Sequence, residues 1–231
     1  MNLFYQPDVP NGVHYLDEDE SRHAVKVLRS VEGDLLDVTD GKGILYKCRI
    51  SKADSRKCSF EIINQVIQSP RSYIVHVAIA PTKNADRIEW FVEKAVEIGV
   101  DKISFLLCQK SERKNINHER IGKLAISAMK QSQQTVLPVI APLLPFNAIA
   151  KEMADQKFIA YVDQANPDHL KTKAAIGKNY LILIGPEGDF SKEELALAMQ
   201  NDFQKVSLGP HRLRTETAGL AACHILNLIN Q

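Results

Sequence analysis

The sequence lacks a long apolar run, and its beginning lacks the pattern of a secretory signal. A membrane-spanning helix needs about 20 consecutive apolar residues. The longest runs here are Tyr180–Ile184 and Ile103–Cys108, and a serine interrupts the second. The first residues have neither the basic start nor the apolar stretch of a signal peptide. We therefore expect a cytoplasmic protein that does not associate with membranes.

The cysteines are few and unpaired in the sequence. Cys48, Cys58, Cys108 and Cys223 lie far apart and form no C-x-x-C pair. Zinc sites and disulfide frameworks need closer spacing, so we expect reduced, mostly buried thiols. The 7 histidines add no ligand-spaced cluster. The sequence therefore indicates no metal site.

The net charge is only +1, which does not by itself indicate a nucleic-acid-binding protein. The charge is unevenly distributed, because residues 71–145 hold 11 Lys and Arg against 7 Asp and Glu. Most of this excess lies in Lys110–Lys130. Such a stretch either attracts phosphates or forms a solvated helix face.

The first 70 residues predict a small β barrel with one helix. Short β-prone runs occupy residues 35–40, 44–50 and 59–67, with a hairpin signal at Asp40–Gly43. The helix is expected at Asp19–Leu28. Residues 69–72 are polar, contain a proline and are typical of a linker.

From Tyr73 onward, strand-length and helix-length segments alternate, which predicts a mostly parallel α/β domain over residues 73–231. Strands are expected at residues 74–80, 102–108, 139–141, 158–162, 180–184 and 206–208, and helices at residues 86–98, 117–133, 145–154, 191–201 and 217–229. Ser191 and Glu194 form a capping box at one helix start. We expect Trp90, on the first of these helices, to pack against the core and not to stack on a base.

Two polar loops follow predicted strands and lead into helices. They are Ile184–Ser191, with the sequence IGPEGDFS, and Leu208–Ala218, with the sequence LGPHRLRTETA. In open parallel sheets, ligands bind beyond the carboxyl ends of the strands. The first loop could also be a tight turn, and Arg214 with Glu216 in the second could pair or cap a helix. Neither loop has a dinucleotide or P-loop motif.

Together, these strings resemble those of the SPOUT-class RNA methyltransferases, and most closely the RsmE family. The two loops are similar to its GPEGG and LG-x-x-I-L-R-x-E-T-A motifs. Three further strings occur in the family's order, so that the resemblance extends over nearly the whole chain. They are Arg22-His23 with Val27-Leu28-Arg29, Lys83 and Arg87 with Glu93–Val100, and Ser111-Glu112-Arg113.

The resemblance implies a PUA-like β barrel at residues 1–70 and a SPOUT domain with a C-terminal trefoil knot at residues 73–231. It also implies a homodimer that uses S-adenosyl-L-methionine to methylate N3 of a uridine in 16S ribosomal RNA of the small subunit. The implied cofactor-binding residues are Ile184, Gly185, Pro186, Glu187, Gly188, Leu208, Gly209, Leu213, Thr217 and Ala218.

We expect Arg214 to stabilise the uridine imide anion, or to contact phosphate, and Glu216 to act as the base. A structural salt bridge is an equal alternative for Glu216. The expected RNA-binding residues are Arg22, His23, Arg29, Lys83, Arg87 and Arg113.

The chain departs from the family pattern at several positions. Lys130–Gln134 replaces the usual E-Q-x-x-R and lacks both its acid and its arginine, while Asp189 and Arg212 replace the usual Gly and Ile. Two alternatives follow from the sequence. One is a catalytically silent RNA-binding or ribosome-assembly protein of the same fold, and the other is a SPOUT methyltransferase with a different RNA target.

Overall fold

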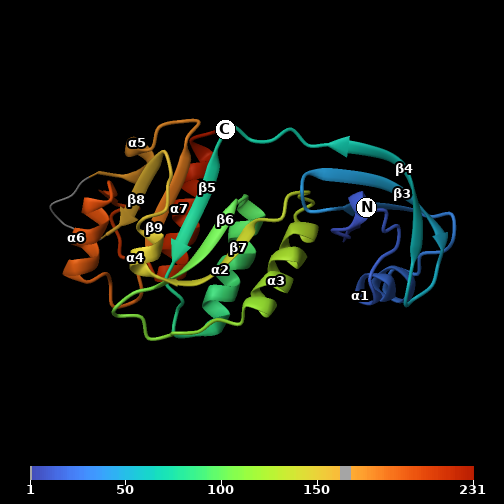
Figure 1. The fold of residues 1–231 in the computed structure, drawn as a ribbon, viewed down its shortest axis with the longest axis horizontal. Helices are drawn as coiled ribbons and strands as arrows, with labels where there is room; N and C mark the ends of the chain where they lie inside the picture. Colours follow the sequence, from blue (N-terminus) through green and yellow to red (C-terminus); the bar gives the residue numbers. More distant parts are fainter. Residues whose placement is uncertain (1, 162–167) are drawn as a thin grey trace. The chain divides into compact units, whose positions relative to one another are not determined.

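A computed structural model describes residues 2–161 and 168–231 (Figure 1), and it forms two compact units. The first contains residues 1–70 and 126–137, and the second contains residues 71–125 and 138–231. The predicted domains at 1–70 and 73–231 left residues 126–137 in the second domain, whereas the structure packs them with the first unit. Val162, predicted to end a strand, lies outside the described residues. Within the described part of the chain, no helix is both long and apolar enough to cross a membrane.

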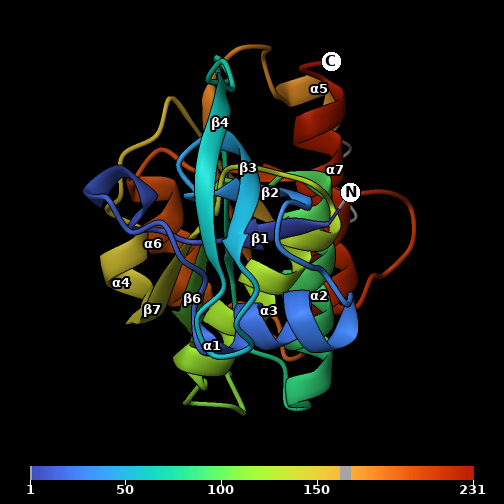
Figure 2. The same ribbon diagram turned by 90° about the vertical axis from the view of Figure 1, so that its right-hand side faces the viewer.

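The first unit is built on a four-stranded sheet in the order β1-β2-β3-β4 (Figure 2). The strands are β1 (Leu3–Tyr5), β2 (Leu35–Thr39), β3 (Ile44–Lys52) and β4 (Ser59–Ile67). β1 is parallel to β2, while β2, β3 and β4 are antiparallel neighbours. In β3, alternate residues Tyr46, Cys48 and Ile50 are buried, as expected for a sheet with one covered face. The sequence analysis missed β1, which has only three residues.

The helix predicted at Asp19–Leu28 changes type along its length. After the short η1 (Val9–Asn11), α1 (Glu18–Arg22) continues as the π-helix η2 (His23–Val27). The carboxylate of Asp17 accepts a hydrogen bond from the backbone of Glu20 and so caps the start. Beyond the end, Arg29 has a left-handed backbone with φ 58°.

Residues 126–137 attach to the first unit through backbone and side-chain contacts. The Thr39 hydroxyl donates to the Thr135 carbonyl at 3.1 Å, and Leu137 N donates to the Gly41 carbonyl at 2.8 Å. Lys130 forms an ion pair with Glu20, and both side chains are largely buried. This segment is far from the first unit in sequence, so local patterns could not reveal that it belongs there.

The second unit contains a six-stranded sheet in the order β10-β8-β9-β5-β6-β7. Its strands are β5 (Ile74–Ile79), β6 (Lys102–Leu107), β7 (Val139–Pro145), β8 (Gln156–Ala160), β9 (Asn179–Ile184) and β10 (Gln204–Val206). Every neighbouring pair is parallel, which confirms the predicted parallel α/β domain. Parallel strands end at one common edge, and this edge carries the site described below.

The helices of this part of the chain are α2 (Ala85–Ile98), α3 (His118–Gln131), α4 (Phe146–Ile149), α5 (Leu170–Lys173), α6 (Lys192–Gln200) and α7 (Thr215–Leu228). Four of them begin and end close to the predicted positions, whereas α4 is shorter than predicted and the short α5 was not predicted. The last part of α3 belongs to the first unit. The helix predicted over 145–154 is wrong beyond its first turn. Ala150 is still buried, but Met153, the one large apolar residue in the rest of the predicted helix, is 93% exposed, so little apolar burial rewards a longer helix.

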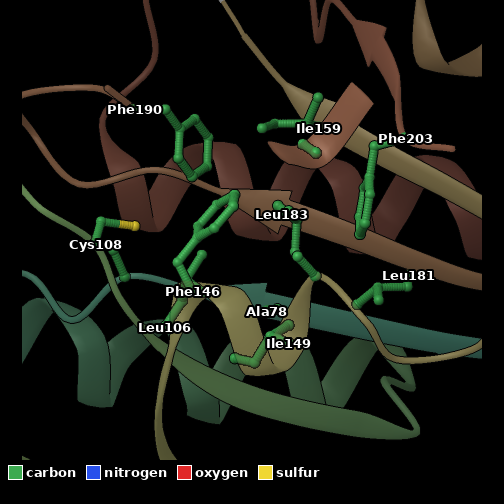
Figure 3. Close-up of a cluster of buried hydrophobic side chains, with 13 residues drawn as sticks. Ala78, Leu106, Cys108, Phe146, Ile149, Ile159, Leu181, Leu183, Phe190 and Phe203 are labelled. Atoms are coloured by element: carbon green, nitrogen blue, oxygen red, sulfur yellow. The ribbon is translucent and has the colours of Figure 1, made fainter. Parts of the chain in front are cut away.

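Helices cover both faces of the sheet. On one face, α2 and α7 pack together and α7 lies against β5 and β9. On the other face, α4 and α6 pack together, and α4 contacts β6 and β7. The apolar cluster on the α4 and α6 side includes Leu183, Phe146 and Phe190 (Figure 3), and the last two rings meet edge to face at 5.8 Å. Because neighbouring strand residues point to opposite faces, each strand contributes to two apolar layers.

The four cysteines are free and buried, as predicted. Burial raises the pKa of both the Cys48 and the Cys223 thiol to about 12. These side chains are therefore protonated at neutral pH and act as small apolar groups.

Gly219 lets α7 lie directly against the sheet and α2. A β-carbon at this position would stand 2.7 Å from the Phe91 ring and 2.9 Å from Ile79. We expect Gly219→Ala to destabilise the protein by about 1–3 kcal/mol through overpacking, measured by denaturant unfolding. Gly122→Ala on α3 is the matched control, because no atom lies within 4 Å of its added methyl group. Equal stability of the two variants would contradict this account.

A buried polar cluster in the sheet predicts that the folded protein loses stability in acid. His76 Nε2 lies 2.8 Å from Ser104 Oγ, and its Nδ1 lies 3.7 Å from Glu152, which also binds Lys102. Burial, reinforced by the Lys102 charge, lowers the pKa of His76 from 6.5 to about 3. Between these two values the unfolded chain binds a proton that the folded chain does not, so this group's contribution to stability falls as the pH falls.

The free energy of unfolding of the wild type should fall with pH below 6.5 because the unfolded chain takes up a proton on His76. We expect His76→Gln to reduce this slope by up to one proton, which corresponds to about 1.4 kcal/mol per pH unit. Denaturant unfolding from pH 7 to 4 measures the slope. His118→Gln, the same substitution at an exposed histidine, is the matched control. If the His76 variant keeps the wild-type slope, the buried imidazole does not cause the acid sensitivity.

Candidate ligand cavity and its neighbouring hollow

A cavity of about 630 Å³ opens at the carboxyl ends of β8, β9 and β10. Its size lies within the range of about 300–1,000 Å³ that is typical of small-molecule sites. Its wall combines strand ends, the loop after β9 and the loop that leads into α7. The lining residues are Arg87, Ala160, Tyr161, Ile184, Gly185, Pro186, Glu187, Asp189, Val206, Ser207, Leu208, Gly209, Pro210, His211, Arg212, Leu213, Arg214, Thr215 and Ala218.

The loop after β9 is held to the core by Phe190, which is 3% exposed and belongs to the cluster in Figure 3. A β-carbon on Gly185 would stand 3.0 Å from this ring. Asp189 takes a left-handed backbone with φ 62°, and its Oδ1 accepts a hydrogen bond from the Phe190 N–H at 2.8 Å. Short polar side chains of this kind can occupy that conformation, which explains why Asp189 is accommodated at this position.

One hydrogen bond joins the two loops that border the cavity. The Thr215 hydroxyl, at the first residue of α7, donates to the Gly185 carbonyl at 3.1 Å. Thr215 itself is buried. The contact holds the start of α7 beside the end of β9 and so sets the width of the cavity between them.

Further polar contacts hold the neighbouring loops at the same sheet edge. The Glu194 carboxylate closes the predicted capping box with Ser191 and also accepts from Gln109 N at 2.7 Å. Lys110 Nζ donates to the Gly188 carbonyl at 3.0 Å, and the Arg113 guanidinium donates to the Lys83 carbonyl at 2.8 Å. These charged groups satisfy backbone atoms and position the loops after β5, β6 and β9.

Most of the predicted cofactor-binding residues line this one cavity. Those that do are Ile184, Gly185, Pro186, Glu187, Leu208, Gly209, Leu213 and Ala218. Gly188 lies outside it, with its carbonyl on Lys110. Thr217 also lies outside it and lines the neighbouring hollow. Gly209 has φ 138°, a conformation that favours glycine.

The two predicted catalytic residues lie at different depths. Arg214 is exposed and borders both the cavity and the neighbouring hollow. The Glu216 side chain is only 9% exposed, borders the hollow alone and lies 3.9 Å from Arg87 Nε. Both sequence-based interpretations of Glu216, as a base and as a salt-bridge partner, therefore fit its position.

The predicted RNA-binding residues are divided between the two units. Arg22, His23 and Arg29 are exposed on the first unit, where Arg22 pairs with Glu18. Lys83, Arg87 and Arg113 belong to the second. Lys83 pairs with Glu112, and Arg87 borders the cavity. Within Lys110–Lys130, the side chains of Lys110, Arg113 and Lys130 all hold other parts of the protein.

The sequence analysis missed the part of the cavity formed by the end of β8. Tyr161 follows this strand, and Ser207 follows β10, directly before the loop that the sequence did indicate. The rule that ligands bind beyond carboxyl ends would have indicated both residues, but the sequence after β8 has no unusual local motif. The other lining residues not predicted are Ala160, Asp189, Val206, Pro210, His211, Arg212 and Thr215.

The fold defines a parallel α/β domain with a ligand cavity at the carboxyl edge of its sheet, preceded in the chain by a small β unit. The sequence model of the family described as "RNA methyltransferase domain" matches residues 69–227, and that of "RNA methyltransferase PUA domain" matches residues 16–63. The chain therefore belongs to the RNA methyltransferase family, which confirms the resemblance seen in its motifs.

Individual relatives match over nearly their whole lengths. A probable rRNA-methyltransferase from Porphyromonas gingivalis is 43% identical, with a TM-score of 0.91 and 99% of each chain covered. A ribosomal RNA small subunit methyltransferase E from Neisseria gonorrhoeae, solved with S-adenosyl methionine, is 25% identical with a TM-score of 0.87, covering 100% of this chain and 98% of that one. The protein of the same name from Aquifex aeolicus is 26% identical, covering 98% of this chain and 99% of the relative.

The bond between the loops can be tested without any ligand. We expect Thr215→Val to lower stability by about 1 kcal/mol, because it leaves the Gly185 carbonyl without its partner. In a chain of this size, that corresponds to a melting temperature lower by about 2–4 °C. Thr215→Ser keeps the hydroxyl and should unfold close to the wild type. If valine and serine unfold at the same temperature, the hydroxyl does not hold the loops together.

Proposed function

We propose that this chain transfers a methyl group from S-adenosyl-L-methionine to N3 of a uridine in 16S ribosomal RNA of the small subunit. The observation that carries the proposal is the cavity at the carboxyl ends of β8, β9 and β10, bounded by two loops that one hydrogen bond ties together. Full-length similarity to small subunit rRNA methyltransferases, one of them solved with this cofactor, supports the same reaction.

The residues around the cavity fit S-adenosyl-L-methionine. Ile184, Leu208 and Leu213 offer apolar walls for an adenine ring, and the loop backbone offers donors and acceptors. The carboxylates of Glu187 and Asp189 lie on the wall and suit the cationic parts of the cofactor. When bound, the cofactor supplies a methyl group on a sulfonium. Transfer of this group needs orientation more than covalent help from the protein.

The protein's own contribution concerns the uridine. Its N3 proton must leave before or during the transfer, which creates an imide anion. The Arg214 guanidinium borders the cavity and can stabilise that anion, while the Glu216 carboxylate is the proposed proton acceptor. The exposed cations of the first unit, Arg22 and Arg29, with His23 beside them, are proposed RNA contacts.

We also propose that the protein acts as a homodimer. The sequence of α7 is apolar nearly all round, with Leu228 50% exposed and Ile225 only half-buried. A helix of this kind is normally covered on every side, and a second copy of the chain would cover its outer face. The proposed location is the cytoplasm, where ribosomal subunits are available.

Methyl transfer to small ribosomal subunits that lack the modification tests the proposal directly. Labelled cofactor should yield label in 3-methyluridine of 16S RNA. We expect Arg214→Ala to lower kcat about 100-fold, as does removal of other groups that stabilise a developing anion. The fold should persist, because the Arg214 side chain makes no capping hydrogen bond.

Lys178→Ala is the control, since Lys178 is an exposed cation immediately before β9, at the opposite edge of the sheet. Full activity of Arg214→Ala would remove Arg214 from the mechanism. Label in a different nucleoside would assign another RNA target. Cofactor binding without transfer to these subunits would contradict the proposed substrate, and failure to bind the cofactor would favour a silent RNA-binding protein.

A further inference from the structure

A second hollow, of about 580 Å³, adjoins the ligand cavity. Its lining comes from the first half of α2, from the loop before α7 and from the first turn of α7. The residues are Asp86, Arg87, Trp90, Arg212, Leu213, Arg214, Glu216 and Thr217. Arg87, Arg212, Leu213 and Arg214 also line the cavity, so a molecule in the hollow would lie next to one in the cavity.

Trp90 is the aromatic side chain of this hollow, and it is 42% exposed. The packing expected from the sequence therefore covers only part of this side chain. The buried face of α2 consists of Ile88, Phe91, Val92, Ala95 and Val96, and Trp90 lies outside this face. A large aromatic surface left open to water beside a ligand cavity indicates a binding function.

Three arginines line the hollow against the two carboxylates of Asp86 and Glu216, and this excess of positive charge favours an anionic ligand with polar edges. Among the described residues, Arg212 and Arg214 form no ion pair, and both are exposed. Arg87 is partly matched by Glu216, at 3.9 Å. Guanidinium groups bind phosphate in a forked geometry, and the largely buried Glu216 carboxylate can accept a hydrogen bond from a base edge.

An aromatic face with free guanidinium groups is how proteins hold an unpaired nucleotide. Unstacked RNA bases lie on aromatic side chains while their phosphates contact arginine. Enzymes that modify bases also need the base outside the helical stack. The hollow provides an aromatic face and guanidinium groups directly beside the cavity.

We propose that this hollow binds an unpaired nucleotide of the substrate RNA, with its base stacked on Trp90 and its phosphate on Arg212. This proposal rests on the proposed function and adds the substrate side of the same site. Trp90 is then a substrate-binding residue that orients RNA toward the cavity.

The chain contains one tryptophan, so fluorescence excited at a wavelength that tyrosine does not absorb reports on this hollow alone. Titration with a short uridine-containing single-stranded RNA should quench the emission, with S-adenosylhomocysteine filling the cavity. Trp90→Ala should raise KM for small ribosomal subunits about 10- to 100-fold, the range expected for loss of one stacked base. Its affinity for S-adenosyl-L-methionine should stay unchanged, and Trp90→Phe should recover most of the loss.

Met199→Ala is the control, because Met199 is similarly exposed near the end of α6, outside both the cavity and the hollow, and should leave KM unchanged. Fluorescence that does not respond to RNA, in a protein that methylates subunits, would overturn the proposal. So would a change of oligomeric state in Trp90→Ala, measured by sedimentation, because a second copy would then cover the tryptophan. If the wild type binds no cofactor but RNA still quenches Trp90, the nucleotide site stands and the proposed methyl transfer fails.

Discussion

The hydrogen bond from Thr215 to the Gly185 carbonyl is the contact on which the geometry of the site depends. The two residues are 30 positions apart in the chain, and each ends or begins a rigid element. β9 stops immediately before Gly185, and α7 begins at Thr215. Gly219 then lets α7 lie against the sheet without a side chain between them. The cavity and the hollow beside it are both consequences of where this helix begins.

The loops at this edge are stabilised mostly by charged groups that bind backbone atoms. Lys110, Arg113 and Glu194 each satisfy main-chain groups of another loop. A positive stretch in the sequence is therefore a poor guide to RNA contacts, because some of its members are already engaged within the protein. Arg212 and Arg214 are a different case, since both are exposed beside Trp90 and the cavity.

The Lys130–Glu20 ion pair gives a structural role to one of the residues at which this chain differs from the usual E-Q-x-x-R motif, at Lys130–Gln134. Both charges are largely removed from water within the first unit, and breaking such a pair from one side is costly. Lys130 therefore has a structural partner in this chain. Gln134 stands at the arginine position of that motif, and nothing in the structure explains this substitution.

The sequence by itself determined the elements with strong local signals. The capping box at Ser191, the periodic apolar face of α2 and the parallel α/β order all agree with the structure. The two cavity loops were also evident, because glycine, proline and charged residues between a strand and a helix are unusual. The trefoil knot stays a prediction that rests on the family resemblance.

Only the tertiary structure decided the features that depend on distant contacts. These include the three-residue strand β1, the early end of α4, and the packing of residues 126–137 with the first unit. It also decided that Trp90 faces water and that Tyr161 and Ser207 complete the cavity. Each of these outcomes depends on which surface a segment meets in space, and a local pattern of residues carries no information about that surface.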